Sequence, residues 1–535
     1  MLRHRRLLAD QRGFTMVTVM MTMMVLGVFT VGAWSAATGD IPIARADQDR
    51  KVAYEAAQAG LQWYAYQLQA NPNYWQQCGS VSGAPWVRNE WNGAGGDPRT
   101  WRTLPTSKAN FTLEVLDKVN PTTQAHTTCS TADPGGTALQ DGTLRIRATG
   151  RSNGDYRSVV GTFRRKGFMD FIYFTQWETQ DPAVSGATNC DKPRSTRGSG
   201  CVDIQFASAD RINGPFHTND ESILTCDSPA FGRTGKSDNF EVAGAAPGYV
   251  KVCGTGVPTF NGPKVVPAGT LQMPDSNDKL KTYAGTSWTF TGQTCLTFKN
   301  NGTVDVQINQ SWAANSPGLI TCSGPIVNRQ LTGVNGPPNG VIFIENGAGC
   351  SGAYSKYQRY TNTAGCGDVA ISGSYSQSVT IGARNDIIVT ADLTHVTDAM
   401  MGLIAENFVR VYHPMMGTGN NCGNNIAGFA PVYQIDAAIL ALNHSFMVDN
   451  YHCGAALTDT PTDPAKAHHL NVNGAIAQYY RGTVATSGGS GVATGYIKNY
   501  NYDDRLKYRS PPNFLDPVQT SWQIIRQTEQ QPATK

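Results

Sequence analysis

The sequence predicts an α+β chain in which a long N-terminal helix and a small antiparallel sheet precede a large, mainly-β domain. Three observations lead to this fold class. Residues 14–39 include no charged side chain, and helical periodicity continues beyond them to Leu68. After residue 70, short apolar runs alternate with turns rich in Gly, Asn and Asp. Glycine is abundant, with 56 residues among 535, which favours strands and turns over helices.

These patterns divide the chain into five segments. We expect a leader at 1–13, a transmembrane and amphipathic helix at 14–69, a small sheet at 70–166, a β-rich head at 167–526 and a polar tail at 527–535. The net charge is only +3, and the basic leader accounts for this excess. The rest of the chain is nearly neutral, which does not favour nucleic-acid binding by the molecule as a whole.

The N-terminal segment is consistent with three kinds of export signal. Its 26 uncharged residues would form a helix of roughly 39 Å, at about 1.5 Å per residue. This length crosses a bilayer, with the basic leader on the cytoplasmic side. A secretory signal would be cleaved near Ser35, Ala36 and Ala37, whereas a simple anchor would not be cleaved. The third possibility is cleavage between Gly13 and Phe14.

Continuation of the helix favours the third possibility. Small and apolar residues recur at intervals of three and four beyond the uncharged run. They are Ala53, Ala56, Ala57, Leu61, Tyr64 and Leu68. A cleaved signal peptide would have no reason to continue as an amphipathic helix. A helix that is first apolar and then amphipathic can pack with copies of itself and support a head.

Two motifs in this region resemble a known family. Arg12-Gly13-Phe14-Thr15-Met16-Val17 resembles the type IV prepilin signal. Ala57-Gln58-Ala59-Gly60-Leu61 resembles the N-terminal domain of PilX-type pilus assembly proteins. The resemblance implies that a prepilin peptidase cuts after Gly13 and that the new N-terminal residue, Phe14, is N-methylated. It also implies assembly with other pilin subunits, starting in the cytoplasmic membrane.

One position departs from the pattern of the family. Most prepilins have Glu as the fifth residue after the cleavage site, where this chain has Thr18. In those pilins the carboxylate is thought to neutralise the N-terminal ammonium of a neighbouring subunit, and an unpaired buried charge is costly. Thr18 and the large head therefore indicate a minor subunit, at the tip of a filament or at its initiation. The exported head would then serve adhesion at the cell surface or in a pilus, with a glycan or a protein as its ligand.

Strand signals follow the helix at 110–118, 143–149 and 156–165. In the second of these, apolar residues alternate with Arg145 and Arg147, as in a half-buried strand. Asn153-Gly154 predicts a hairpin turn between the last two strands. A long helix followed by a small antiparallel sheet is the arrangement that the pilin resemblance implies.

The head region repeats short apolar runs between polar turns, often about ten residues apart. The runs include 341–344, 369–371, 379–381, 387–389 and 403–405. A parallel β-helix and a β-sandwich both fit this texture. We favour the parallel β-helix because 340–347 and 385–389 look like stacked rungs, and because Asn-rich turns can stack as side-chain ladders.

The cysteines indicate an oxidising compartment, because they are scattered, even in number and without Cys-x-x-Cys spacing. They are Cys78, Cys129, Cys190, Cys201, Cys226, Cys253, Cys295, Cys322, Cys350, Cys366, Cys422 and Cys453. Nearest-neighbour pairing would give 78–129, 190–201, 226–253, 295–322, 350–366 and 422–453. The sequence leaves the other pairings open.

No catalytic motif stands out, and we expect neither enzymatic activity nor a cofactor. His217, with Asp210, Arg211 and Asp220 nearby, is the most suggestive acid–base cluster. The simpler interpretation is a turn in which the histidine bonds to backbone groups.

We predict no metal site, although the sequence contains one histidine pair and one set of aspartates that could be ligands. Adjacent histidines, His468-His469, would point to opposite faces of a strand. Calcium is the second candidate metal, but the spacing of the aspartates that would bind it matches no EF-hand loop. Its ligands would be Asp503 and Asp504 with Asp449 or Asp516.

Two further clusters have a structural and a functional interpretation. Arg145, Arg147, Arg151, Arg157, Arg164, Arg165 and Lys166 form a basic stretch. We interpret this stretch as a solvated strand face or a contact with anionic lipid, with DNA binding as the alternative. Tyrosines gather near the C-terminus, at Tyr479, Tyr480, Tyr496, Tyr500, Tyr502 and Tyr508. We predict that they cap the last rung of the β-helix, although exposed tyrosines also stack on sugars.

The leading hypothesis is therefore a minor pilin that presents a disulfide-braced head. Two alternatives stay open. One is a membrane-anchored, exported enzyme that acts on polysaccharide, and it requires several carboxylates on one groove. The other is a DNA-capturing pseudopilin, which loss of DNA binding on changing Arg145, Arg147 and Arg164 to Ala would support. Nucleic acid is not the expected partner.

Overall fold

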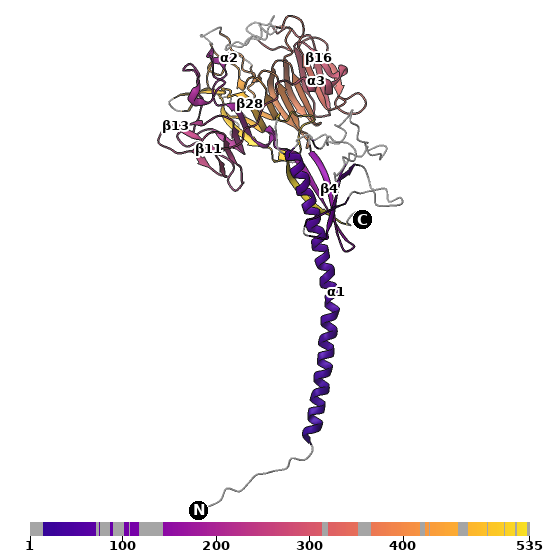
Figure 1. Ribbon diagram of the computed structural model, residues 1–535. Helices are drawn as coiled ribbons and strands as arrows, with labels where there is room; N and C mark the ends of the chain where they lie inside the picture. Colours follow the sequence, from indigo (N-terminus) through magenta and orange to yellow (C-terminus); the bar gives the residue numbers. More distant parts are fainter. Residues whose placement is uncertain are drawn as a thin grey trace, which may run out of the picture.

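A single long helix carries a β-rich head at its far end (Figure 1). The computed structural model describes residues 14–70, 74, 86–88, 101–105, 107–116, 143–312, 319–350, 365–417, 423–426, 429–457, 469–488, 491–507, 509–518 and 522–531. The helix, α1 (Phe14–Ala70), has 57 residues and begins and ends close to the predicted bounds. At about 1.5 Å per residue it is roughly 85 Å long.

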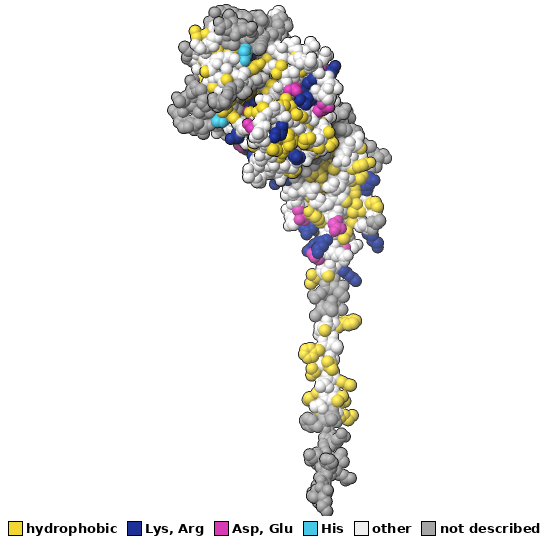
Figure 2. Space-filling model, turned by 90° about the vertical axis from the view of Figure 1, so that its left-hand side faces the viewer, with side chains coloured by type: hydrophobic (Ala, Val, Ile, Leu, Met, Phe, Trp, Pro, Cys, Tyr) yellow, Lys and Arg dark blue, Asp and Glu magenta, His cyan; other side chains and the backbone are white. Residues whose placement is uncertain are grey.

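The two halves of α1 have different surroundings. The segment Met16–Ser35 has a mean hydropathy of 2.0 and is long and apolar enough to cross a membrane. Its side chains are exposed, and Figure 2 shows hydrophobic side chains on the surface of this part of α1. In the second half, the predicted stripe is fully buried against a sheet. Its members are Ala53, Ala56, Ala57, Leu61, Tyr64 and Leu68.

The sheet that covers this stripe is small and mostly antiparallel. Its strands are β1 (Trp86–Arg88), β2 (Arg102–Thr103), β3 (Asn110–Val115), β4 (Thr143–Ser152), β5 (Asp155–Arg165) and β32 (Trp522–Gln530). They lie in the order β1-β3-β4-β5-β32, with β2 beside β3. The predicted hairpin turn joins β4 to β5, and both Asn153 (φ 45°) and Gly154 (φ 94°) adopt the positive φ that a two-residue turn of this kind requires.

The last strand corrects the expectation of a polar tail at 527–535. Strand β32 pairs antiparallel with β5 from Trp522↔Arg165 to Gln530↔Ser158. Residues 527–530 therefore belong to the small sheet and not to a tail, and residues 532–535 lie outside the described chain. The sequence of this segment is polar because most of its side chains are exposed to solvent at the edge of the sheet.

The head begins with a first block of strands that covers residues 168–265. Its strands are β6 (Tyr173–Trp177), β7 (Gln205–Phe206), β8 (Arg211–Asn213), β9 (Phe216–Thr218), β10 (Ile223–Cys226), β11 (Ala230–Phe231), β12 (Phe240–Val242), β13 (Tyr249–Cys253), β14 (Thr259–Phe260) and β15 (Lys264–Val265). Its short helices are η3 (Phe168–Asp170), α2 (Pro182–Ser185) and η4 (Arg194–Thr196).

The second block covers residues 286–507. Its strands are β16 (Thr289–Thr291), β17 (Thr294–Phe298), β18 (Thr303–Gln307), β19 (Val327–Gln330), β20 (Val341–Glu345), β21 (Val369–Tyr375), β22 (Val379–Ala383), β23 (Ile387–His395), β24 (Met401–Ala405), β25 (Val409–Val411), β26 (Gln434–Ala441), β27 (Phe446–Val448), β28 (His469–Tyr480), β29 (Ala485–Gly488), β30 (Gly491–Gly495) and β31 (Ile497–Tyr502). Its 3₁₀ turns are η5 (Thr286–Trp288) and η8 (Asp504–Lys507).

Most strands of the two blocks join parallel ladders in which each strand pairs with a later or earlier turn of the chain. The first ladder runs β16-β20-β22-β24-β26-β28-β6-β9-β12-β15. The second runs β17-β21-β23-β25-β27. The third joins parts of β21, β23, β26 and β28 to β31, β8, β11 and β14.

One column of buried side chains shows how regular the first ladder is. Its members are directly aligned from strand to strand: Ile342, Ile381, Leu403, Ile439, Ile476, Tyr173, Phe216 and Phe240. The column changes from aliphatic to aromatic where the second block meets the first. Stacked side chains of this kind form the continuous core of the head.

The order of the ladders differs from the order of the chain. Strand β6, the first of the head, pairs with β28 and β9 in the middle of the stack, not at an end. Figure 1 shows β11 and β13 at one end of the head and β16 with α3 (Asp278–Ala284) at the other. Residues 266–285 connect the blocks by running back along the stack, where Asn277 Nδ2 donates to the carbonyl of Ala383 at 2.7 Å. We call the contact of β28 and β31 with β6 and β8 the seam.

The seam corrects the predicted role of the C-terminal tyrosines. Strand β31 is not the last rung, because it pairs with β28 on one side and with β8 on the other. Tyr496, Tyr500 and Tyr502 are therefore buried in the stack instead of covering its end. Tyr479 and Tyr480 are half-buried, and Tyr508 lies outside the described residues.

Within the described part of the head, four disulfides have both cysteines placed, and all four agree with nearest-neighbour pairing. They are Cys190–Cys201, Cys226–Cys253, Cys295–Cys322 and Cys350–Cys366. Cys453 is also disulfide-bonded. The predictions for Cys78, Cys129 and Cys422 lie outside the described residues.

Candidate functional site

An ordered array of polar side chains lies on the third ladder. Strands β26, β28, β31 and β8 each contribute two outward residues separated by one inward residue. We call the outward residues the polar face. One column is Gln434, Asn471, Asn499 and Arg211, and the other is Asp436, Asn473, Asn501 and Asn213.

Alternation along each strand produces this face. The residues between the polar pairs point inward and are almost fully buried, at Ile435, Val472, Tyr500 and Ile212. Because side chains of a strand alternate between its two faces, burial of these four places their polar neighbours outside. Parallel pairing in register then aligns the polar residues into columns.

Hydrogen bonds between the rungs hold these amides in fixed orientations. Asn213 Nδ2 donates to Oδ1 of Asn501 at 2.8 Å and to Oδ1 of Asn499 at 3.2 Å. Asn499 Nδ2 donates to Oδ1 of Asn471 at 2.5 Å. At the other end of the face, Asn473 Nδ2 donates to Oδ1 of Asp436 at 3.0 Å. The polar face is therefore a pre-ordered surface.

The other two ladders do not leave such a face exposed. On the first, the strand residues of β22 and β24 are buried throughout, and the segment that contains Asn277 crosses over them. On the second, Trp312 and Tyr412 pack in a cluster with outward residues such as Ile388. The polar face is partly open to solvent: Asn471 and Asp436 are buried, Arg211 is exposed, and the other five members are partly exposed.

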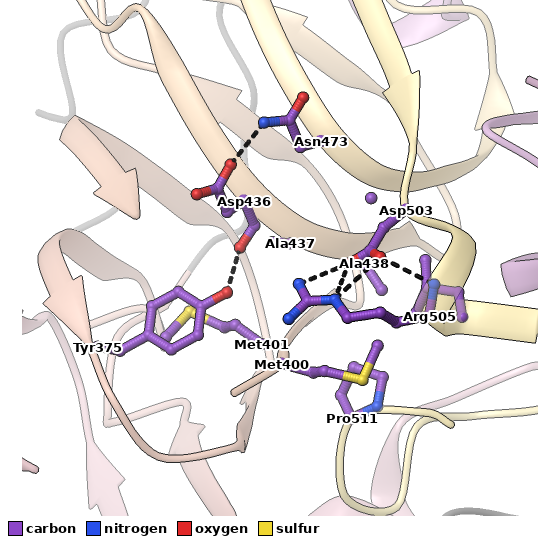
Figure 3. Close-up of a pocket in the computed structure, with 12 residues that line it drawn as sticks. Tyr375, Met400, Met401, Asp436, Ala437, Ala438, Asn473, Asp503, Arg505 and Pro511 are labelled. Atoms are coloured by element: carbon purple, nitrogen blue, oxygen red, sulfur yellow. Dashed lines mark hydrogen bonds and ion pairs between the residues drawn. The ribbon is translucent and has the colours of Figure 1, made fainter. Parts of the chain in front are cut away.

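A small pocket lies where the polar face meets the end of β31 (Figure 3). Its volume of about 10 Å³ is enough for roughly one water molecule. Asp436 faces it and bonds to Asn473, while Nδ1 of His395 lies 2.9 Å from the other carboxylate oxygen. Asp503 in the same pocket accepts three bonds from the guanidinium of Arg505. Both carboxylates are thus hydrogen-bonded to partners within the chain.

The structure does not bring the members of the predicted cluster around His217 together. His217 is buried between aromatic rings, 4.9 Å from Phe171 and 5.4 Å from Phe174 between ring centroids. Its Nδ1 lies 2.9 Å from Oε2 of Glu241. Asp210 instead binds Lys498, so that the neighbours suggested by the sequence point elsewhere.

His217 and Glu241 form part of the joint between the head and the small sheet. Lys166, directly after β5, donates to both carboxylate oxygens of Glu241, at 3.1 and 2.9 Å. Burial raises the pKa of Glu241, but hydrogen bonds from His217 and Lys166 outweigh this effect and lower the pKa to about 2. A carboxyl group with a depressed pKa stabilises the fold above its unfolded pKa, and the contribution disappears as the pH falls through the folded pKa.

We therefore expect the joint to weaken between about pH 4.5 and pH 2. The unfolding temperature of the wild-type protein should fall over this range more steeply than that of Glu241→Gln, which has no carboxyl to titrate. Thermal unfolding of both proteins at several pH values measures the difference. Parallel curves for the two proteins would contradict the role of Glu241.

The seam contains two buried ion pairs with a consistent polarity. Arg481 Nη1 lies 3.0 Å from Oε2 of Glu178, and Lys498 Nζ lies 3.1 Å from both carboxylate oxygens of Asp210. Burial lowers the pKa of Lys498. In both pairs the cation comes from the second block and the anion from the first. The seam is therefore electrostatically complementary as well as apolar.

The proposed calcium ligands do not converge. Asp504 pairs with Arg233 and Lys507, and Asp449 pairs with Arg410. Among the described residues, no group of three His, Cys, Asp or Glu side chains is arranged to hold a metal ion. His468 lies outside the described chain.

Most cations of the basic stretch have partners within the chain. Arg147 pairs with Glu114, Arg157 with Glu529, Arg164 with Asp170 and Lys166 with Glu241. Arg151 lies over the ring of Trp101, with 4.0 Å from its guanidinium carbon to the ring centroid. Arg145 is exposed, and the side chain of Arg165 is not described. Pairing of this kind reduces the charge that a DNA backbone would meet.

Sequence reasoning did not find the polar face, although a signal was present. Asn471-Val472-Asn473 and Asn499-Tyr500-Asn501 share a polar–apolar–polar pattern in strand-like sequence. This pattern indicates outward polar pairs. It does not indicate which strands lie next to one another, so the array becomes visible only with the strand pairing.

No protein-family model matches the chain, and no curated protein matches it. Among solved structures, the chain is similar to the competence-associated pilin ComZ from Thermus thermophilus, with 13% sequence identity and a TM-score of 0.25. The match covers 90% of this chain and 97% of that one. A TM-score this low does not establish a shared fold.

Proposed function

We propose that this protein is an exported, membrane-anchored subunit of a type IV pilin-like filament. The observation that carries this proposal is α1, a single helix whose first part is apolar and exposed and whose second part is packed under a sheet. An isolated apolar segment of this length is stable in a bilayer or against other apolar helices. The same helix can therefore serve as an anchor before assembly and as the packing element within a filament.

Close packing of α1 on the small sheet supports this role, because a load-bearing shaft must be firmly joined to its head. The Cα of Gly150 lies so close to the helix that an added Cβ would collide with the backbone of Ala53 and Ala57. At Gly161 the side chain of Leu61 packs directly on the strand, and an added Cβ there would lie 2.9 Å from a methyl carbon of Leu61. The helix and the sheet thus form one body.

Within such a filament we infer a minor subunit, at the tip or at initiation. Thr18 offers no carboxylate to a neighbouring N-terminal ammonium, which disfavours repeated insertion along the filament. The wide head in Figure 1 also extends far beyond the shaft of α1. Both features favour a position where few neighbouring subunits are required.

We further infer that the head is a parallel β-helix that is braced by disulfides and presented for adhesion. The three parallel ladders, with side chains aligned in register along one column, support this interpretation. The head has a pre-ordered polar surface, while the described residues offer no converging metal ligands. We therefore propose a binding role for the head instead of a catalytic one.

Mass spectrometry of the N-terminus tests the filament proposal. We expect the protein from membranes and from sheared surface filaments to begin at N-methylated Phe14. A Gly13→Val variant should retain residues 1–13 and should be missing from the sheared material. A mature chain that begins near Ala37 would overturn the proposal, because an ordinary signal peptidase would then have removed the apolar half of α1.

A further inference from the structure

We propose that the polar face binds a linear, uncharged polysaccharide. This inference rests on the proposed function of the head in adhesion and gives the chemical class of its ligand. The surface concerned consists of the two columns on β26, β28, β31 and β8. The polymer would lie across the rungs, so that successive sugars meet successive strands about 4.8 Å apart.

The side chains of the face match the hydrogen-bonding chemistry of hydroxyl groups. Five of its members are asparagines and one is a glutamine, and each amide offers both donors and an acceptor. The five asparagines are Asn471, Asn473, Asn499, Asn501 and Asn213. A hydroxyl group also donates and accepts, so neutral sugars can exchange bonds with such a surface without burying a charge.

Part of this hydrogen-bonding capacity is left over. Within the described chain, no hydrogen bond is assigned to Oδ1 of Asn473 or to Oδ1 of Asn213, although their Nδ2 groups are used. Both side chains are partly exposed. These oxygens are therefore acceptors that remain available to a ligand while the amide is already held in place by its neighbour.

The charge of the face argues against an ionic polymer. Its single carboxylate, Asp436, is 7% exposed and bonds to His395, Gln434 and Asn473. Its single cation, Arg211, stands at one end of a column. A DNA or acidic-polysaccharide site requires several unpaired cations along the path of the chain.

The apolar content of the face argues against a protein partner. Large exposed hydrophobic side chains occur elsewhere in the described head, for example at Val250, Val252 and Val327. None of those in the described residues lies on β26, β28, β31 or β8. Protein interfaces are enriched in aromatic residues and methionine at their centres, and this face exposes none.

Rigidity should help such a surface to bind. The amides are ordered by bonds to one another before any ligand arrives, as between Asn499 and Asn471 and between Asn213 and Asn501. Ordering of side chains costs free energy on binding, and a pre-ordered array avoids much of this cost. Repetition along the columns also lets several weak contacts act together on one polymer.

Binding of short oligosaccharides to the full-length protein in detergent tests the proposal. The neutral probes are cellohexaose and chitohexaose, and the acidic probe is an oligogalacturonate of the same length, all measured by calorimetry. We expect a neutral probe to bind and the acidic probe to bind more weakly. Asn473→Ala and Asn501→Ala should each weaken binding up to about tenfold. Asn339→Ala, an exposed asparagine on another part of the head, should leave it unchanged.

A second variant separates binding from stability. Asn213→Tyr adds bulk outside the stack, so it should block the face. It loses only the two hydrogen bonds of a partly exposed amide, so the unfolding temperature should fall by no more than the few degrees that about 1 kcal/mol causes. Absence of binding to both neutral probes, stronger binding of the acidic probe, or equal binding by all variants would overturn the proposal. Loss of self-association in the variants would also overturn it, because the occupant would then be a second copy of the chain.

The outcomes for the ligand and for the filament can be told apart. If the neutral probes do not bind while the N-terminus is methylated Phe14, only the ligand inference is wrong. If the mature chain begins near Ala37, the filament proposal is wrong whether or not the oligosaccharide probes bind.

Discussion

Replacement of Glu178 by glutamine should lower the free energy of unfolding by about 3–5 kcal/mol, because it leaves a buried cation without a counter-ion. The side chains of Arg481 and Glu178 are each 1% exposed, and their charged atoms lie 3.0 Å apart. The guanidinium of Arg481 also donates to the carbonyls of Ile204 and Gln205, which prevents it from turning toward solvent. Denaturant titration of the full-length protein in detergent measures the loss.

An exposed ion pair provides the matched control. Lys51 and Asp47 lie 3.3 Å apart on α1, with side chains 74% and 63% exposed, and Asp47→Asn should cost no more than about 0.5 kcal/mol. Arg481→Met and the double variant with Glu178→Gln complete a double-mutant cycle, from which we expect a coupling toward the upper end of about 0.5–3 kcal/mol. A loss below about 1 kcal/mol in Glu178→Gln would show that the seam admits water and that the pair is not buried in solution.

The second large effect is expected at Gly150. An added Cβ would lie 2.6 Å from the backbone nitrogen of Ala57 and closer still to the carbonyl oxygen of Ala53. Backbone atoms of a helix cannot move aside as a flexible side chain does, so Gly150→Ala must push β4 away from α1. We expect a cost at the upper end of the roughly 1–3 kcal/mol that overpacking usually causes.

Limited proteolysis and thermal unfolding together measure this effect. Gly150→Ala should expose the second half of α1 to cleavage, at sites such as Arg50 and Lys51, and should lower the unfolding temperature. Gly269→Ala is the control, because its added Cβ would meet no atom within 4 Å. Equal behaviour of the two variants would contradict the close approach of helix and sheet.

Local patterns predicted the parts of the fold that local sequence determines. The stripe from Ala53 to Leu68 is buried as its spacing indicated, and the turn at Asn153-Gly154 has the required positive φ angles. Both features depend on residues that are close in sequence. Four of the six nearest-neighbour cysteine pairs are confirmed for the same reason, since the rungs bring nearby parts of the chain together.

Features that depend on distant pairing could not be predicted. Strand β32 looks like a polar tail because its partner, β5, lies more than 300 residues earlier. The tyrosines of β31 looked like an end cap because the sequence ends nearby, whereas β8 continues the stack beyond them. The polar face has the same origin, since Asn501 and Asn213 become neighbours only across the seam. Periodicity indicates which side of a strand is polar, but not which strand lies beside it.

The position of β32 beside β5 affects how the head would bear a mechanical load. The head is tied to the small sheet twice, by the connection after β5 and by the connection before β32, and these two strands end side by side at Trp522↔Arg165. A pull on the head is therefore shared between two neighbouring strands. A proteolytic cut in either connection would leave the head attached through the other. Detachment of β32 by a force along its length would have to shear its ladder from Arg165 to Ser158 as a unit instead of opening it one pair at a time. If the head has the adhesive role that we propose, such an attachment would keep it on its shaft while a bound surface is pulled.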